Sequence, residues 1–248
     1  KEIPQDALYY LCSENYLSIN CGKYLENAQY IKASLTKRDA KNNEIPINFD
    51  DIIESVKNER IVLISDMPKT GKTVLMHQLY EKLLSDSPDY WVSLVSSYDL
   101  KLLLLNDEHQ YITKLLQINP LERFIYDQKF SKGLVKFLFD EIDEVFVNNQ
   151  ELFAAIKLSK KQKKEKNCQI FMTCRPHLEK DFQSGFDVTP YKMKRFTVND
   201  QIKFLNQFWR PSNDDVVLVD ECAKLLVSYY SHLLITPQRL HSMADHFK

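Results

Sequence analysis

A lysine and a threonine follow a glycine after a run of apolar residues, in the segment Ile61–Thr73 (IVLISDMPKTGKT). The apolar residues at its start predict a strand buried on both faces, and the residues after Thr73 predict a helix over Val74–Leu84. Because a helix amino terminus offers free N–H groups and a partial positive charge, this junction suits a phosphate group. Lys72 would reach the β- and γ-phosphates of a nucleotide, and the Thr73 hydroxyl would ligate Mg²⁺.

The residues expected to surround the phosphates form one contiguous loop. They are Met67, Pro68, Lys69, Thr70, Gly71, Lys72, Thr73 and Val74. Gly71 lets the backbone approach a phosphate where a Cβ would collide. Asp66 stands where the phosphate-loop signature has its first glycine. Its carboxylate could repel phosphate, or it could leave the end of the strand in a different turn.

A second apolar run, Phe137–Asp140 (FLFD), predicts another strand that ends in a carboxylate. In P-loop NTPases an aspartate at this place holds Mg²⁺, so we expect Asp140 to share the metal with the loop threonine. Three further acids follow at once, Glu141, Asp143 and Glu144. Taken alone, the segment is also compatible with an exposed acidic turn after a core strand.

A third apolar strand is predicted over Gln169–Cys174, and Arg175 and Pro176 follow it. A cation at the carboxyl end of a strand beside the loop strand can reach a γ-phosphate. Arginine suits that task because its planar fork meets phosphate oxygens bidentately. The alternative is an ordinary surface arginine at the start of a loop.

In this order and spacing, the three segments resemble the NACHT branch of the STAND NTPases. The Walker B element of that family, D-x-h-D-E, is matched by Asp140, Ile142, Asp143 and Glu144. Its sensor element, T-[SC]-R-P, is matched by Thr173, Cys174, Arg175 and Pro176. The family often has a small residue where this chain has Glu141, so Asp140 and Glu141 also match the acidic pair of an ordinary ATPase, in which the glutamate activates water. The resemblance therefore leaves Glu141 and the pair Asp143 and Glu144 as rival candidates for positioning the water that attacks the nucleotide.

Three other segments extend the resemblance. Arg195–Trp209 is similar to the link into the family's helical domain, and Leu233–Ala244 is similar to the element whose proline, here Pro237, approaches the nucleotide. Tyr30–Leu35 resembles the segment that lies near the adenine. The resemblance therefore implies that the base is held between the loop and the helical domain.

The resemblance also implies a function. It implies that ATP or ADP binds with Mg²⁺ and switches the chain between a closed and an open state, with slow or absent hydrolysis. The switch would control oligomerisation or signalling, in innate immunity, of a longer protein whose other domains are its partners. A second interpretation is a nucleotide-independent or pseudo-ATPase scaffold for protein assembly, and a third is an AAA-type ATPase motor.

The alternation of strands and helices predicts an α/β fold, a P-loop NTPase three-layer sandwich with a mostly parallel sheet followed by a small all-α domain. We expect a helical or irregular lead-in over residues 1–49, a nucleotide-binding domain over 50–196 and a helical domain over 197–248. In the last part, Thr197 or Asn199 can cap a helix. The apolar face of that helix would hold Ile202, Phe204, Leu205 and Phe208.

Charge and composition narrow the range of partners. The 248 residues carry a net charge of −1, which gives no general attraction to nucleic acid or to an anionic membrane. Lysines are concentrated over Lys157–Lys166, which we interpret as a solvated helix end rather than a patch for nucleic acid or an acidic partner. No apolar run approaches the roughly 20 residues that span a membrane.

The five cysteines lack a CxxC spacing, which favours a reducing compartment and hence the cytoplasm. The histidines show no metal-binding spacing, so the expected Mg²⁺ would arrive with the nucleotide. The first residues resemble neither an initiator methionine nor a signal peptide, and we expect the chain to be a fragment of a longer protein.

Overall fold

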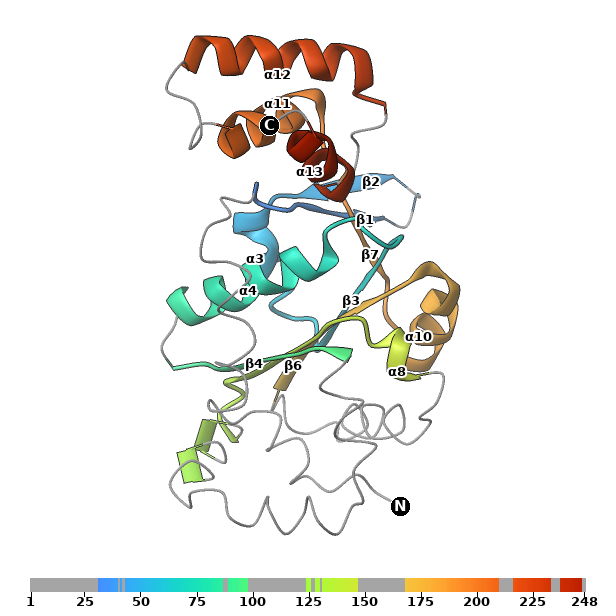
Figure 1. The fold of residues 1–248 in the computed structure, drawn as a ribbon. Coiled ribbons are helices and arrows are strands. Elements are labelled where there is room, and N and C mark those ends of the chain that lie inside the picture. The colour runs from blue at the N-terminus through green and yellow to red at the C-terminus, as the bar shows by residue number, and fades with distance from the viewer. Residues whose placement is uncertain are drawn as a thin grey trace.

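The structure is a computed structural model that describes residues 31–39, 41, 43–86, 89–97, 124–125, 128–129, 131–146, 168–209, 216–232 and 237–246. Within these residues, one sheet of seven strands has the order β2-β1-β7-β3-β6-β5-β4 (Figure 1). The strands are β1 (Leu35–Arg38), β2 (Glu44–Ile47), β3 (Ile61–Ser65), β4 (Trp91–Val95), β5 (Val135–Phe139), β6 (Cys168–Cys174) and β7 (Tyr191–Met193).

The five strands from β7 to β4 are parallel, and β1 and β2 add an antiparallel edge. Every residue of β3, β4 and β6 is buried, as expected where helices cover both faces of a parallel sheet. β6 lies between β3, which leads into the phosphate loop, and β5, which leads into the acidic turn. The expected mostly parallel sheet is confirmed, and its order brings the ends of these three strands to one edge.

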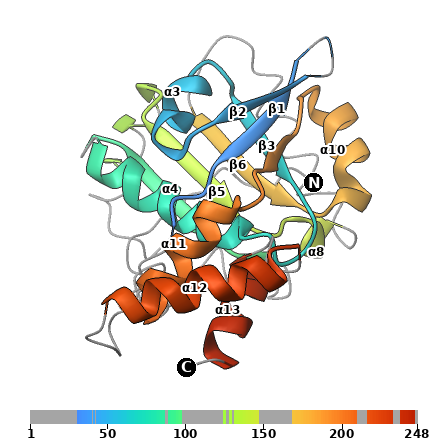
Figure 2. The same ribbon diagram turned by 90° about the horizontal axis from the view of Figure 1, so that it is seen from above.

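Helices cover the sheet on both sides, so the expected three layers are confirmed (Figures 1 and 2). On one side lie α3 (Ile52–Ser55), which follows the 3-10 turn Phe49–Asp51, and α4 (Lys72–Asp86). The other side carries α8 (Asp143–Phe146), the turn Pro176–Leu178 and α10 (Glu179–Phe186). Each side has its own apolar core, the first built with Leu75, Met76, Leu79 and Leu83 of α4 and the second with Phe182 and Phe186 of α10.

Three helices follow the sheet and pack on one another: α11 (Val198–Trp209), α12 (Val216–Tyr230) and α13 (Pro237–His246). Thr197 is the residue that caps α11, because its Oγ1 accepts the Asp200 N–H at 3.2 Å while Asp200 Oδ2 accepts the Thr197 N–H at 2.9 Å. This reciprocal pair is a capping box with aspartate in the usual glutamate position. Phe204 and Leu205 are buried in the resulting cluster.

Two local features differ from expectation. A helical or irregular lead-in was predicted for residues 1–49, yet Leu35–Ile47 contains the hairpin β1–β2. Asp39 Oδ1 accepts the N–H groups of Lys41 and Asn43, both at 2.8 Å, which lets the chain reverse there. The loop helix also begins at Lys72, two residues before the predicted start. Residues 1–30 and the lysine run at 157–166 lie outside the described part of the chain.

None of the helices in the described ranges is long and apolar enough to cross a membrane.

Candidate nucleotide-binding site

The loop between β3 and α4 is folded around the Lys72 ammonium group. Lys72 is buried, and its Nζ donates to the carbonyl oxygens of Asp66 and Met67, both at 2.8 Å. Thr70 Oγ1 donates to the same Met67 carbonyl at 2.9 Å. The ammonium therefore lies against the first turn of the loop, at the start of a 15-residue helix, where a phosphate would also meet free helix N–H groups.

Two residues of this loop have left-handed backbone conformations. Gly71 has a φ of 95° and Lys69 has a φ of 71°. Glycine adopts such an angle without a steric cost, whereas lysine does not. Gly71 is thus required by the conformation of the loop. Asp66 is absent from the described residues with positive φ, so its backbone has no need of the signature glycine.

The side chain of Asp66 is held by two backbone N–H groups. Its Oδ1 accepts the Met67 N–H at 2.7 Å, and its Oδ2 accepts the Met193 N–H of β7 at 3.0 Å. The sequence suggested that this carboxylate could either repel phosphate or change the turn at the end of β3. Its two hydrogen bonds correspond to the second effect, a role in the turn.

The acidic turn after β5 is fastened to β6 by Thr173. The buried Thr173 Oγ1 donates to Asp140 Oδ1 at 2.5 Å and accepts the Glu141 N–H at 2.7 Å. The Thr173 carbonyl accepts the Ile142 N–H at 3.0 Å. Glu141 has a φ of 53°, in the left-handed region that disfavours a residue with a Cβ. The strained turn is therefore held by Thr173, which is also the first residue of the predicted sensor element Thr173–Pro176.

Arg175 follows β6 and is engaged by the acids that follow β5. Its Nη2 donates to Glu144 Oε1 at 2.5 Å, and its Nε lies 3.4 Å from Asp143 Oδ2. Ser97 Oγ donates to the second oxygen of Glu144 at 3.1 Å. Asp143 is buried, and its Oδ1 has no hydrogen-bond partner among the described residues. A phosphate that reached Arg175 would therefore compete with two carboxylates.

The loop and the acidic turn influence one another electrostatically. Burial lowers the pKa of Lys72, and the negative charges of Asp66 and Asp140 oppose that change. Burial raises the pKa of Glu141, and the neighbouring carboxylates of Asp140 and Glu144 raise it further. The cause is geometric: Lys72 follows β3 and the acids follow β5, and these two strands flank β6 in the sheet. The predicted phosphate-binding and metal-binding residues thus come together at one edge of the sheet.

The residues proposed for the metal are suitable for Mg²⁺. Asp140 is buried at the carboxyl end of β5, and Thr73 is exposed in the first turn of α4. Mg²⁺ prefers oxygen ligands and is usually held by one or two protein groups together with phosphate oxygens and water. A carboxylate and a hydroxyl beside the phosphate loop fit that pattern.

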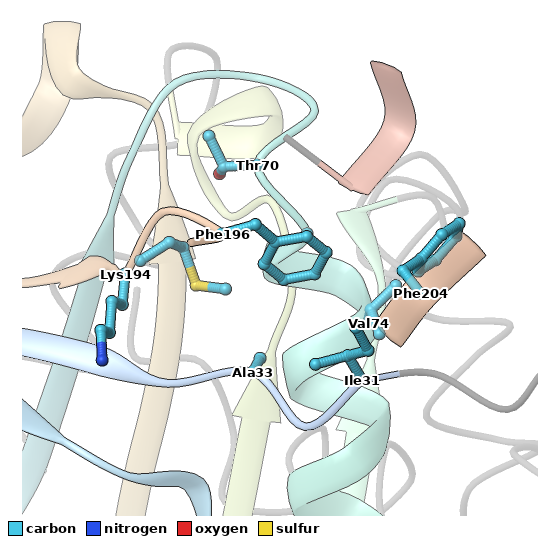
Figure 3. Close-up of a pocket in the computed structure, with 9 residues that line it drawn as sticks. Ile31, Ala33, Thr70, Val74, Lys194, Phe196 and Phe204 are labelled. Carbon is cyan, nitrogen blue, oxygen red and sulfur yellow. The ribbon is translucent and has the colours of Figure 1, made fainter. Parts of the chain in front are cut away.

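A small apolar pocket adjoins the loop (Figure 3). Its walls come from four parts of the chain: Ile31 and Ala33, the loop and α4 residues Thr70, Gly71 and Val74, the β7 end at Met193, Lys194 and Phe196, and Phe204 of α11. The free volume is about 20 Å³, which is room for about one water molecule. A nucleobase would therefore need the aromatic side chains of Phe196 or Phe204 to move.

Gln78 of α4 holds the amino-terminal wall of this pocket. Its Oε1 accepts the Ala33 N–H at 3.1 Å, and its Nε2 donates to the Ile31 carbonyl at 3.2 Å. The expectation that the segment around 30–35 lies near the loop agrees with this geometry, although Tyr30 lies outside the described residues. Gln78 itself was not predicted, because it belongs to no motif and its partners lie far from it in the sequence.

Pro237 is the first residue of α13, a position where proline is favoured. Its side chain is outside the described part, so its approach to a nucleotide stays a prediction.

No protein-family model matches the chain, and no curated protein matches it. Among solved structures, the chain is similar to a Walker-type ATPase of Pyrococcus abyssi, with 16% identity over 72% of this chain and 61% of that one and a TM-score of 0.45. It is also similar to AMPPCP-bound DnaA from Aquifex aeolicus (14% identity, 78% of this chain and 58% of that one, TM-score 0.46). A third is C. elegans PCH-2 (16% identity, 64% of this chain and 42% of that one, TM-score 0.36). The chain spans less than two thirds of the length of each.

Proposed function

We propose that this chain is an ATP- or ADP-binding switch of the NACHT type, with slow or absent hydrolysis. The observation that carries the proposal is the convergence of Lys72, Asp140 and Arg175 at the carboxyl ends of β3, β5 and β6, which are neighbours in the sheet. Ligands of open α/β sheets bind at this edge. A phosphate loop, a metal-binding carboxylate and a γ-phosphate sensor are the parts that such a switch needs.

Each residue has a defined task in this proposal. Lys72 and the backbone N–H groups of residues 69–74 bind the phosphates, because Pro68 has no N–H and the Met67 N–H donates to Asp66. Thr73 and Asp140 hold the Mg²⁺ that arrives with the nucleotide. When bound, the metal would neutralise phosphate charge and orient the terminal phosphate. The base would enter the apolar pocket beside Thr70 and Val74 once Phe196 or Phe204 moves. The resemblance assigns Pro237 of α13 a contact with the nucleotide.

The switch depends on what Arg175 contacts. In the structure its guanidinium pairs with Asp143 and Glu144. A γ-phosphate would draw the fork away from these acids, whereas a diphosphate would leave it with them. A ligand biases an equilibrium only through such differential contacts, so ATP and ADP would favour different arrangements of the acidic turn.

The acids differ in their suitability as a base for hydrolysis. Asp143 and Glu144 are partly neutralised by Arg175, while burial and then the neighbouring carboxylates raise the pKa of Glu141, which makes its carboxylate a stronger base than an ordinary glutamate. Glu141 is therefore the first candidate among the three. Its backbone is fixed by the left-handed φ and by the hydrogen bond from its N–H to Thr173 Oγ1.

The test is to denature the purified chain, identify any released nucleotide by ion-pair chromatography, and titrate the refolded or nucleotide-stripped protein with Mg-ATP and Mg-ADP. ATP or ADP near one per chain in the native protein, absent from Lys72→Ala, is the expected result. Equal affinities for ATP and ADP with identical conformations would exclude the switch. No binding of either would favour the nucleotide-independent scaffold.

The partners follow from the switch. The change in the acidic turn would be transmitted through the helical part to other domains of a longer chain or to a second copy of this one. Size-exclusion chromatography with light scattering, in Mg-ADP and in a non-hydrolysable ATP analogue, would report self-association that depends on the nucleotide. We include in the same proposal that the longer protein acts in the cytoplasm, in innate immune signalling.

A further inference from the structure

The backbone pairing between β3 and β7 is short and is extended by a side chain. The parallel register joins only Ile64 and Tyr191. Beyond this pair, Asp66 Oδ2 accepts the Met193 N–H at 3.0 Å, which a backbone carbonyl would do in a longer ladder. The Asp66 N–H itself donates to the Cys174 carbonyl of β6 at 3.2 Å. Asp66 therefore connects the end of β3 to both neighbouring strands.

A second carboxylate supports the same junction from α10. The hydroxyl of the fully buried Ser65 donates to Glu179 Oε2 at 2.5 Å, and the Lys192 ammonium forms an ion pair with the same carboxylate. Burial acts to raise the pKa of Glu179, but the hydrogen bonds from Lys192 and Ser65 outweigh it and lower the pKa. Two successive residues, Ser65 and Asp66, are thus joined to two successive residues of β7.

The β7 end of this junction leads directly to the base pocket. Met193 and Lys194 line the pocket together with Thr70 and Gly71 of the loop; Figure 3 labels Lys194 and Thr70 among these. Four residues after Met193, Thr197 caps α11. A displacement of the loop relative to β7 would therefore also displace the pocket wall and the start of the helical part.

We propose that Asp66 is a positioning residue that, supported by Glu179, locks the phosphate loop to β7 so that the phosphate and base sites keep a fixed relation. Its consequence for ligand affinity rests on the proposed nucleotide-binding function. In this proposal, Asp66 replaces the first glycine of the phosphate-loop signature and has a positioning function of its own. Glycine at this position would remove both hydrogen bonds of the carboxylate and gain nothing, since the φ of residue 66 is not positive.

Hydrogen exchange tests the lock without any ligand. In Asp66→Gly we expect the Met193 amide and the peptides covering residues 67–71 and 192–196 to exchange about tenfold faster, and in Asp66→Asn by less, because one carbonyl acceptor remains. Asp39→Asn is the matched control, because Asp39 also accepts two backbone N–H groups. Unchanged exchange at Met193, or an equal rise in all strands, would overturn the proposal.

Affinity provides the second test. Asp66→Gly should weaken Mg-ADP binding about tenfold and inorganic pyrophosphate binding much less, because the loop persists while its relation to the base pocket is lost. Equal or tighter ADP binding by Asp66→Gly would show that aspartate is a defect of the loop and would overturn the proposal. If the wild-type chain binds no nucleotide, the proposed function fails, and exchange at Met193 still decides whether the lock exists.

Discussion

The Arg175 guanidinium donates to Glu144 Oε1 at 2.5 Å, so a cation at the end of β6 is paired with an acid of the turn that follows β5. Both groups are only partly buried, and such pairs contribute about 0–1 kcal/mol. An interaction of this size can hold the arginine in one place and still yield to a phosphate, which carries more charge and also accepts the planar fork.

Removing the charge of Glu144 should therefore shift the preference of the site toward the triphosphate. Glu144→Gln weakens the hold on Arg175, and we expect the ratio of ATP to ADP affinity to rise about two- to fivefold, the equivalent of the pair's energy. Isothermal titration with each Mg-nucleotide measures the ratio. Glu54→Gln is the control, because it removes an exposed ion pair between Glu54 of α3 and Lys57, which follows that helix. A ratio that stays constant or falls would contradict the competition between Glu144 and phosphate.

Lys72 offers the most direct test of the phosphate site. Lys72→Ala should weaken Mg-ADP binding about 10- to 100-fold, because a hydrogen bond to a charged group contributes about 1.5–3 kcal/mol. Titration calorimetry gives the affinity, and circular dichroism checks that α4 persists. Lys82→Ala is suitable as a control, since Lys82 lies on the same helix and pairs with Asp86. An affinity loss of equal size in both variants would mean that the helix, rather than the ammonium, is responsible.

Thr173 is expected to matter for stability as well as for the site. Thr173→Val keeps the shape of the side chain but leaves Asp140 Oδ1 and the Glu141 N–H without their buried partner. We expect the free energy of unfolding to fall by about 1–3 kcal/mol, measured by urea denaturation. Thr173→Ser should recover most of the loss, and the exposed Thr189→Val should change little. Full stability in Thr173→Val would show that water replaces the hydroxyl at no cost.

The strands that carry the site could be predicted because each is an apolar run that ends in a residue with a distinct chemistry. Lys72, Asp140 and Arg175 follow such runs, and the parallel order of β3, β6 and β5 brings them together. The hairpin β1–β2 could not be predicted, because β2 is mostly exposed and contains Pro46, so its pairing has no apolar periodicity. Partnerships such as Asp66 with Met193 depend on strands far apart in the sequence, and no local pattern encodes them.

Gln78 should contribute to binding of the nucleotide base and not to binding of the phosphates. Gln78→Glu keeps an acceptor for the Ala33 N–H but loses the donor to the Ile31 carbonyl, and it places a charge next to that oxygen. We expect Mg-ADP affinity to fall about fivefold, as for one lost hydrogen bond, while the affinity for inorganic pyrophosphate stays constant. Gln183→Glu on the exposed face of α10 is the control. Equal losses for both ligands would place the effect of Gln78 on the loop.

Glu141 should make the stability of the chain depend on pH. Its pKa in the folded state is raised above the ordinary value of 4.5, chiefly by burial and then by Asp140 and Glu144. The folded state therefore binds this proton more tightly than the unfolded state, so the contribution is fully present below pH 4.5 and is lost as the pH rises through the raised pKa.

Glu141→Gln cannot ionise at this position, so it does not lose stability as the pH rises. The variant should therefore melt a few degrees above the wild type at pH 7.5, and the difference should shrink as the pH falls toward 5. Thermal unfolding followed by circular dichroism at several pH values measures the difference. Glu221→Gln, on the exposed face of α12, gives the baseline for removing a glutamate charge from the surface. A gain that is constant with pH, or that grows toward acid, would mean that Glu141 is not destabilised by ionisation in the folded chain, and its candidacy as the base for hydrolysis would lose its physical basis.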